Sequence, residues 1–410
     1  MVTNEDARRR QLLTIAVGLV LAMATWFSTA AVLGELRDRW SLSSVQASWL
    51  TIGVQLGFVL GAFASAATNL ADRVNPRRLL AAGALGAAAA NLAIVAVDGF
   101  SGALALRFLT GAFLALVYPP ALKVISSWYI TGRGFAMGVM IAALTVGSAL
   151  PHLINAAGGL GWRETLIATS AVTVVGGAIV ERLGADGPHS LAPAVFDPSQ
   201  LRALVRNRHF RLATAGYFGH MWELYAMWAW ITAFYGDAFG AGNERWASFA
   251  GFGAIAAGAV GSVYAGVVSD RRSRSEAAGI ALRWSGSVAL VAGFLLDAPT
   301  PIVVGIGLVW GFWVVADSAQ FSTIVTEVTE ARYVGTALTV QLASGFVLTV
   351  FTIFLVPVVR DAHGWGWAFL LLAPGPLLGG LAMWALSRAV DEPRPRPAAG
   401  PEATFVSPYF

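Results

Sequence analysis

The sequence predicts an all-α, polytopic membrane protein with twelve transmembrane helices. Hydrophobic residues make up 57% of the 410 residues and charged residues only 12%, whereas about 25% charged residues would be usual for a soluble domain. A helix needs about 20 apolar residues to cross a bilayer, and the chain holds many runs of that kind. Runs such as Leu12 to Thr25 do not alternate in polarity, which excludes the strands of a membrane barrel.

The apolar runs define twelve spans in order along the chain. The first run follows Arg8-Arg9-Arg10 and continues too far for a signal peptide, so we interpret it as a first membrane helix that is retained. The predicted spans cover residues 12 to 34, 46 to 68, 79 to 97, 102 to 125, 134 to 156, 164 to 182, 211 to 236, 246 to 268, 279 to 297, 301 to 325, 335 to 358 and 366 to 388.

Basic residues predict the orientation of these spans. Lys and Arg near membrane ends collect on the cytoplasmic side, and most of the 27 Lys and Arg residues fall in segments that are cytoplasmic if the N-terminus is inside. We therefore expect a multi-pass protein of the cytoplasmic (inner) membrane with both termini in the cytoplasm. The pI near 9.7 then reflects topology, and no nucleic-acid partner is expected.

A polar segment occurs twice and indicates an internal repeat. Residues 68 to 78 contain Asp72-Arg73, and residues 266 to 274, about 200 positions later, contain Asp270-Arg271. Ala47-Ser48 and Ala247-Ser248 recur at a similar interval. We therefore expect parallel six-helix bundles over residues 1–182 and 211–388, a cytoplasmic linker over 183–210 and a disordered tail over 389–410.

The linker carries a possible helix start. Asp197-Pro198 could cap a short cytoplasmic helix that holds Arg202 and Arg206.

These segments resemble the major facilitator superfamily of secondary transporters. The signature loop of that family, Gly-x-x-x-Asp-Arg-x-Gly-Arg-Arg, is matched at Asp72, Arg73 and Arg77, with departures at Thr68 and Asn75-Pro76. The second copy matches at Gly266, Asp270, Arg271 and Arg274. Arg107 to Gly111 is similar to the family's fourth-helix motif Arg-x-x-Gln-Gly, with Thr110 as a departure. The antiporter motif is only partly present, as Gly138, Gly147 and Pro151.

The two signature loops predict a gate. Their charges could cap a helix or pair across the inner face, and so hold the two halves in one arrangement until the pairing breaks. The alternative is that they only anchor the loops and enforce topology. The candidate gating residues are Asp72, Arg73, Arg77, Asp270, Arg271 and Arg274.

Two acidic residues lie deep within predicted spans, where a charge is costly and usually functional. Glu223 is in the middle of the seventh span, with His220 one turn before it on the same face. Apolar surroundings favour the neutral form of a carboxyl, so Glu223 could load and release a proton with His220 as a relay. A structural hydrogen bond to another helix is the alternative.

The second deep carboxylate belongs to a possible binding stripe. Asp317 shares a face with Trp313, Gln320 and Phe321, which could hydrogen-bond and stack a small ligand, or could simply pack. On the fourth span, Arg107 and Tyr118 lie on one face, before Pro119-Pro120, which favours a kink. Arg107 is a candidate contact for an anion, or for one of the two carboxylates.

Three functional hypotheses remain open. The leading one is a secondary active transporter that moves a small organic anion, with Arg107 as its contact, by proton-coupled alternating access. The alternative is a proton-driven multidrug efflux antiporter with Glu223 and Asp317 as cation contacts. A channel or membrane sensor on a transporter fold is the alternative from another class.

The sequence also limits the possible chemistry and the possible partners. An enzyme is disfavoured because no HExxH, phosphate loop or nucleophile motif occurs. We expect a small-molecule substrate, protons and the lipid bilayer as partners, a single chain as the functional unit, no cofactor and no metal. The chain has no cysteine, which excludes disulfides and thiolate metal sites.

Overall fold

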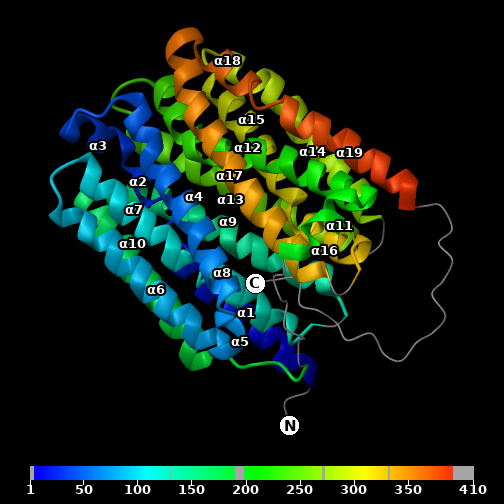
Figure 1. Ribbon diagram of the computed structural model, residues 1–410. Coiled ribbons are helices and arrows are strands. Elements are labelled where there is room, and N and C mark those ends of the chain that lie inside the picture. The colour runs from blue at the N-terminus through cyan, green and yellow to red at the C-terminus, as the bar shows by residue number, and fades with distance from the viewer. Residues whose placement is uncertain (1–3, 130, 190–197, 270–272, 331–332, 391–410) are drawn as a thin grey trace, which may run out of the picture.

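A computed structural model describes residues 4–129, 131–189, 198–269, 273–330 and 333–390, which form helices and no strand (Figure 1). The first half holds α1 (Asn4–Ala22), α2 (Ser28–Ala31), α3 (Leu33–Trp40), α4 (Ser44–Ala67), α5 (Leu70–Arg73), α6 (Pro76–Ala93), η1 (Ile94–Ala96), α7 (Phe100–Leu114), α8 (Tyr118–Ser126), α9 (Arg133–Gly158) and α10 (Trp162–Leu183). The rest holds η2 (Pro198–Gln200), α11 (Leu201–Arg206), α12 (Arg208–Phe239), α13 (Glu244–Ser269), α14 (Arg274–Ala292), η3 (Gly293–Leu295), α15 (Thr300–Ala316), α16 (Ser318–Val328), α17 (Val334–His363), α18 (Trp365–Leu370) and α19 (Pro374–Val390).

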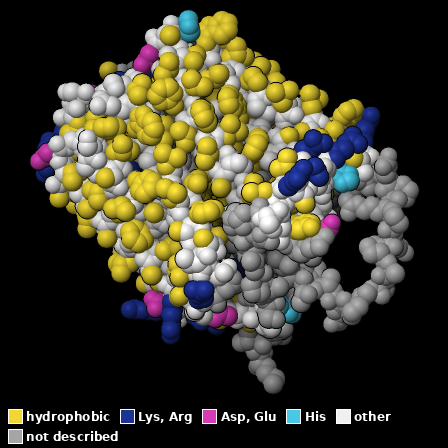
Figure 2. Space-filling model, in the orientation of Figure 1, with side chains coloured by type: hydrophobic (Ala, Val, Ile, Leu, Met, Phe, Trp, Pro, Cys, Tyr) yellow, Lys and Arg dark blue, Asp and Glu magenta, His cyan; other side chains and the backbone are white. Residues whose placement is uncertain are grey.

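The predicted all-helical membrane fold is confirmed. Ten helices of the described chain are long and apolar enough to cross a bilayer. The first and seventh predicted spans correspond to α1 with α2 and to the 32-residue α12. Figure 2 shows hydrophobic side chains over the middle of the visible surface, with charged side chains toward its edges. Large apolar residues such as Leu13, Leu60 and Leu378 are accordingly more than half exposed, as expected where lipid is the solvent.

We call the end of the bundle where α1 and α12 begin the inner face, and the end that carries α3 and the start of α13 the outer face. Figure 1 shows α3 and α18 toward one end and α5 and α11 toward the other. The linker contains the expected short helix, because α11 ends at Arg206 and includes Arg202. Asp197, the predicted cap, and the tail from residue 391 lie outside the described residues.

The sequence repeat has a counterpart in the helices. Ser44 starts α4 and Glu244 starts α13, and Pro76 and Arg274 start α6 and α14, each of which passes into a 3₁₀ turn. The fourth predicted span breaks between α7 and α8, and the tenth breaks at Asp317 between α15 and α16. The break near Pro119-Pro120 agrees with the kink that these prolines favour, whereas the predicted tenth span of 301 to 325 runs unbroken past Asp317 and is wrong on this point.

Glycines allow close crossings at equivalent places in the two halves. A Cβ atom on Gly111 of α7 would overlap the carbonyl oxygen of Val54 on α4, and one on Gly311 of α15 would overlap that of Ala254 on α13. Small residues let membrane helices approach this closely. The repeated glycines therefore bring the fourth-span and tenth-span helices against their neighbours in the same way.

The first predicted span is not one continuous helix. Residues 23–27 form turns between α1 and α2. The turn carries Trp26 and Phe27, and both side chains are almost completely buried. Where a helix opens inside a membrane, its backbone groups need hydrogen-bond partners from elsewhere in the protein. Arg107 supplies two of these partners.

Candidate functional site

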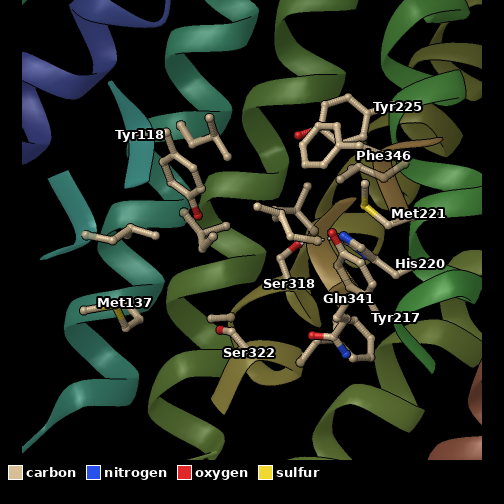
Figure 3. Close-up of a pocket in the computed structure, with 18 of the residues that line it drawn as sticks. Tyr118, Met137, Tyr217, His220, Met221, Tyr225, Ser318, Ser322, Gln341 and Phe346 are labelled. Carbon is tan, nitrogen blue, oxygen red and sulfur yellow. Dashed lines mark hydrogen bonds between the residues drawn. The ribbon is translucent and has the colours of Figure 1, made fainter. Parts of the chain in front are cut away.

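A cavity of about 120 Å³ lies between the two halves of the chain. Its walls come from α8 and the first part of α9 on one side, and from α12, α16 and the first part of α17 on the other. Figure 3 shows Tyr118 and Met137 facing His220, Ser318 and the other labelled residues across this space. Because α9, α12 and α17 begin at the inner face, this central cavity lies in the inner half of the bundle.

The lining of the central cavity is aromatic and largely uncharged. Tyrosine, tryptophan, phenylalanine and methionine contribute most of it, and the described lining residues include no Lys, Arg, Asp or Glu. Its polar groups include the ring of His220, the hydroxyl of Ser318 and the amide of Gln341. The Gln341 Nε2 atom is buried and has no hydrogen-bond partner among the described residues. Such a surface suits a mainly apolar ligand that offers one or two polar groups.

His220 connects the cavity to a buried carboxylate. Its Nδ1 lies 2.7 Å from Oδ1 of Asp317, with the two side chains only 3% and 1% exposed. Its Nε2 lies 3.3 Å from the Ser318 hydroxyl, which lines the cavity. The ring N–H is not well aligned with the carboxylate, so the contact is best described as a close ion pair when His220 is protonated. The pair can hold a proton beside the cavity.

Glu223 faces a different neighbourhood. Its Oε1 accepts a hydrogen bond of 2.7 Å from Nε1 of Trp310 on α15, and the side chain is almost fully buried. Glu223 does not line the central cavity. It therefore lies inside the second half, one helical turn from the His220–Asp317 pair.

Arg107 supplies partners for the opened backbone of the first span. Its side chain is fully buried. Nη1 donates to the Thr25 carbonyl at 2.9 Å and Nη2 donates to the Trp26 carbonyl, while Nε donates to the Leu50 carbonyl of α4 at 3.2 Å. A guanidinium has five donors in a fixed fork. It can therefore bind the carbonyl groups of Thr25 and Trp26, which lie in the opened turn, and at the same time the Leu50 carbonyl of α4.

Asn91 extends this network to two further helices. Its Oδ1 accepts from Arg107 at 3.3 Å and from the Ser28 hydroxyl at 2.6 Å. Its Nδ2 donates to the Leu166 carbonyl and the Ser170 hydroxyl on α10. Arg107 does not line the central cavity, and the hydrogen-bond partners of its side chain among the described residues are all neutral.

Aromatic rings from both halves meet next to the opened segment. We call this set the aromatic plug; its closest ring pair is Phe58–Phe346 with centroids 4.8 Å apart, followed by Trp26–Phe58 at 4.9 Å. Tyr225 packs against Phe346 and Trp26 at 5.1 and 5.9 Å. The members of the plug are Trp26, Phe27, Phe58, Tyr225, Trp228 and Phe346.

A second hollow opens on the outer side of the plug. This outer vestibule has a volume of about 420 Å³. It is lined by Ala30 to Arg37, the last turns of α12, the start of α13, Asn155 and Arg360. Along α12, Tyr225 and Trp228 line the central cavity, whereas Trp230 and Thr232 line the vestibule. The plug therefore separates the two spaces, and the structure is closed toward the outer face.

Comparison with known proteins identifies the fold and the family. A sequence profile of the Major Facilitator Superfamily matches residues 15–282. The chain belongs to the major facilitator superfamily. A crystal structure of a bacterial homologue of the human lysosomal transporter Spinster, in an inward-facing and occupied conformation, superposes with a TM-score of 0.70 at 15% identity. The match covers 94% of this chain and 98% of that one. No curated protein matches the chain.

The helices that follow the two signature loops, α6 and α14, begin at the inner face. Arg77 at the start of α6 pairs with Asp186, with Nε 3.1 Å from Oδ1, and donates to the Gly184 carbonyl at 2.7 Å. Arg274 at the start of α14 pairs with Glu327 on α16 at 2.8 Å. Arg77 thus contacts the start of the linker directly after α10, and Arg274 contacts a helix of its own half.

Of the remaining candidate gating residues, only Arg73 has a side chain that the structure describes. Arg73 is exposed at the end of α5. The side chain of Asp72, together with Asp270 and Arg271, lies outside the described residues. The departure from the superfamily motif at Asn75-Pro76 has a physical reason: the Asn75 side chain accepts from the backbone N–H of Arg77 at 3.0 Å, and Pro76 occupies the first position of α6. Both residue types favour a helix start.

Some sequence-predicted site residues of this superfamily member come together and others do not. Tyr118, His220 and Phe321 line the central cavity, with Asp317 in contact with His220. Gln320 instead donates weakly to the Ala265 carbonyl at 3.5 Å. Trp313 stacks on Trp284, with centroids 5.9 Å apart. Neither lines the cavity.

Sequence reasoning missed several residues of the cavity. Tyr217, Met221 and Trp228 lie on the α12 face that carries His220, and they could have been found by extending that face by whole turns. Gln341 could have been found as an isolated amide in a long apolar run. Ser318 and Phe346 gave no comparable signal, because hydroxyls and aromatic rings are common in membrane helices.

Proposed function

We propose that this transporter carries a small, mainly apolar and aromatic solute through the central cavity, coupled to a proton on the His220–Asp317 pair. The observation that carries the proposal is the contact of 2.7 Å between a cavity-lining histidine and a buried carboxylate. Intramembrane ionisable residues of this kind mark ion and proton pathways. Glu223, one turn away, is the second candidate position for the coupling proton.

The lining supports the lipophilic-solute hypothesis over the anion hypothesis. Aromatic and methionine side chains dominate the walls, and the described lining includes no Lys or Arg that would offset a substrate's negative charge. Arg107 donates to backbone carbonyls and lies outside the cavity, so we do not propose it as the substrate contact. A protonated amine or an aromatic cation would instead gain from the ring faces and from the nearby Asp317.

Ligand binding tests this proposal. Purified protein in detergent should be stabilised against heat by tetraphenylphosphonium or by neutral aromatic compounds more than by small carboxylates. At 100 times its dissociation constant, a ligand adds about 2.7 kcal/mol to the folded state. Asp317→Asn should weaken the stabilisation by tetraphenylphosphonium, whereas Val347→Leu, at an exposed position of α17, should retain it. Stabilisation by carboxylates alone would contradict the proposal.

We also propose that the inner face lies in the cytoplasm, with both termini on that side of the cytoplasmic membrane. The support is the concentration of arginine in the inner-face segments, including Arg8 to Arg10 and α11. The chain has no cysteine, so one introduced cysteine is a unique label site. In intact cells an impermeant maleimide should label Ala241→Cys and spare Arg202→Cys; the opposite pattern would reverse the orientation.

A further inference from the structure

One face of α9 runs from the central cavity to the outer vestibule. Ile141, Thr145, Ser148, His152 and Asn155 follow one another at intervals of three or four residues, which places them on a single helical face. Ile141 and Thr145 line the cavity, and Asn155 lines the vestibule. Ser148 and His152 therefore span the length of helix that separates the two spaces.

His152 is completely buried, yet among the described residues only one of its ring nitrogens has a partner. Nδ1 lies 3.2 Å from the hydroxyl of Thr232 on α12, and Thr232 lines the outer vestibule. His152 Nε2 and the hydroxyl of Ser148 are buried without a hydrogen-bond partner among the described residues. Leaving polar atoms buried and unpaired is costly. Their presence on this face therefore requires an explanation other than packing.

Charged groups on the elements packed against α9 lie at the two faces of the bundle, away from His152. At the outer face, Arg245 of α13 donates to the carbonyl of Ala156 at 2.9 Å. At the inner face the charges include the arginines at the start of α1. The outer-face groups also include Glu244 of α13 and Arg163 and Glu164 of α10, and the inner-face groups include Glu5 and Asp6 of α1, Lys123 of α8, Glu181 and Arg182 of α10 and Glu327 of α16. On α12, which contacts His152 through Thr232, Asp237 lies in the outer vestibule, and His220 and Glu223 lie on the other side of the plug. His152 is thus the titratable side chain in the middle of this α9 face.

We propose that this face of α9 carries the coupling proton between the outer vestibule and the central cavity, with His152 as the relay. The inference rests on the proposed proton coupling, and it adds the route by which the proton passes the aromatic plug. Histidine suits this role because its two ring nitrogens can accept and release a proton on different sides.

The transfer balances without any further reactant. The Thr232 hydroxyl gives its proton to Nδ1 of His152 and takes one from a hydronium ion in the vestibule, which leaves a water molecule and a singly positive ring. The ring then releases its Nε2 proton toward Ser148 and the cavity, where the His220–Asp317 pair accepts it. Transfer of the remaining Nδ1 proton to Nε2 through water then restores the starting tautomer.

The test follows proton access to His220 without needing the substrate. Protein labelled with ¹⁵N-histidine is reconstituted in vesicles with its outer face exposed, and the lumen is buffered at pH 8. When only the external solution is acidified, the ring signals of His152 and His220 should move. His220 should respond at least about tenfold more slowly in His152→Gln. Acidifying only the lumen should move the His220 signal equally in both proteins, which shows that the variant is folded.

A second pair of variants tests the route at its outer end. Thr232→Val removes the hydroxyl and should slow the response of His220 to external acid, whereas Thr232→Ser keeps the hydroxyl and should preserve it. An unchanged response in both His152→Gln and Thr232→Val would overturn the proposed route. A His220 signal that follows neither external nor lumenal pH in the parent would instead contradict the proposed function.

Discussion

Replacing Arg107 by methionine is expected to lower the free energy of unfolding by about 1–3 kcal/mol, the cost of one buried polar group left unpaired. Methionine fills similar space but leaves the Trp26 carbonyl without the guanidinium donor, whereas the Thr25 carbonyl keeps the Ser28 hydroxyl and the Leu50 carbonyl lies within the ladder of α4. The measurement is an unfolding curve of the purified protein in mixed micelles with increasing SDS.

Two further variants make the Arg107 result specific. Arg107→Lys should fall between parent and methionine variant, because an ammonium keeps the charge but lacks the planar fork of donors. Arg202→Met removes an arginine that is exposed on α11 and should leave the midpoint unchanged. If the unfolding midpoint of Arg107→Met equals that of the parent, the opened segment of the first span is stable without the hydrogen bonds of Arg107.

Replacing Asp317 by asparagine is expected to reduce proton-driven uptake on the order of 100-fold while counterflow exchange continues, because the amide keeps the shape of the side chain but cannot bind a proton. The measurement compares uptake of a ligand from the stability panel into proteoliposomes with and without an imposed pH difference. Asp297→Asn, at an exposed position, is the matched control. Parent-like accumulation in Asp317→Asn would remove this carboxylate from the coupling mechanism.

Glu223→Gln separates the two buried carboxylates. The glutamine retains an oxygen that can accept from Trp310, so the fold should tolerate the change. If Glu223 also carries the coupling proton, this variant should lose proton-driven uptake as Asp317→Asn does. If its role is the hydrogen bond to Trp310, uptake should keep its dependence on the pH difference.

The sequence was a good guide to the helices because membrane crossing imposes a length and a composition. The second and seventh predicted spans differ from α4 and α12 by only a few residues at their ends. The breaks were harder to predict. Pro119-Pro120 indicates one of the helix breaks, but residues 23–27, where another break occurs, contain no proline or glycine. That turn depends on Arg107, which is distant in sequence, and single-helix patterns do not report such partners.

The candidate site was predictable in part for the same reason. His220 and Asp317 stood out as ionisable groups in apolar runs, and they prove to be neighbours. Sequence position alone could not show that Glu223 faces Trp310 while His220 faces the cavity. The two residues are almost one turn apart on α12, so a small rotation of the helix decides which of them meets the solute.

The aromatic plug also affects how the membrane voltage is distributed across the protein. Its rings come from both halves and touch at centroid distances of about 5 to 6 Å, which leaves a layer of low polarity between the two chambers. A membrane voltage of 100 mV is worth about 2.3 kcal/mol per elementary charge. Much of that voltage would fall across this layer. In the closed form no continuous file of water crosses the plug, so the protein does not dissipate the proton gradient that drives transport.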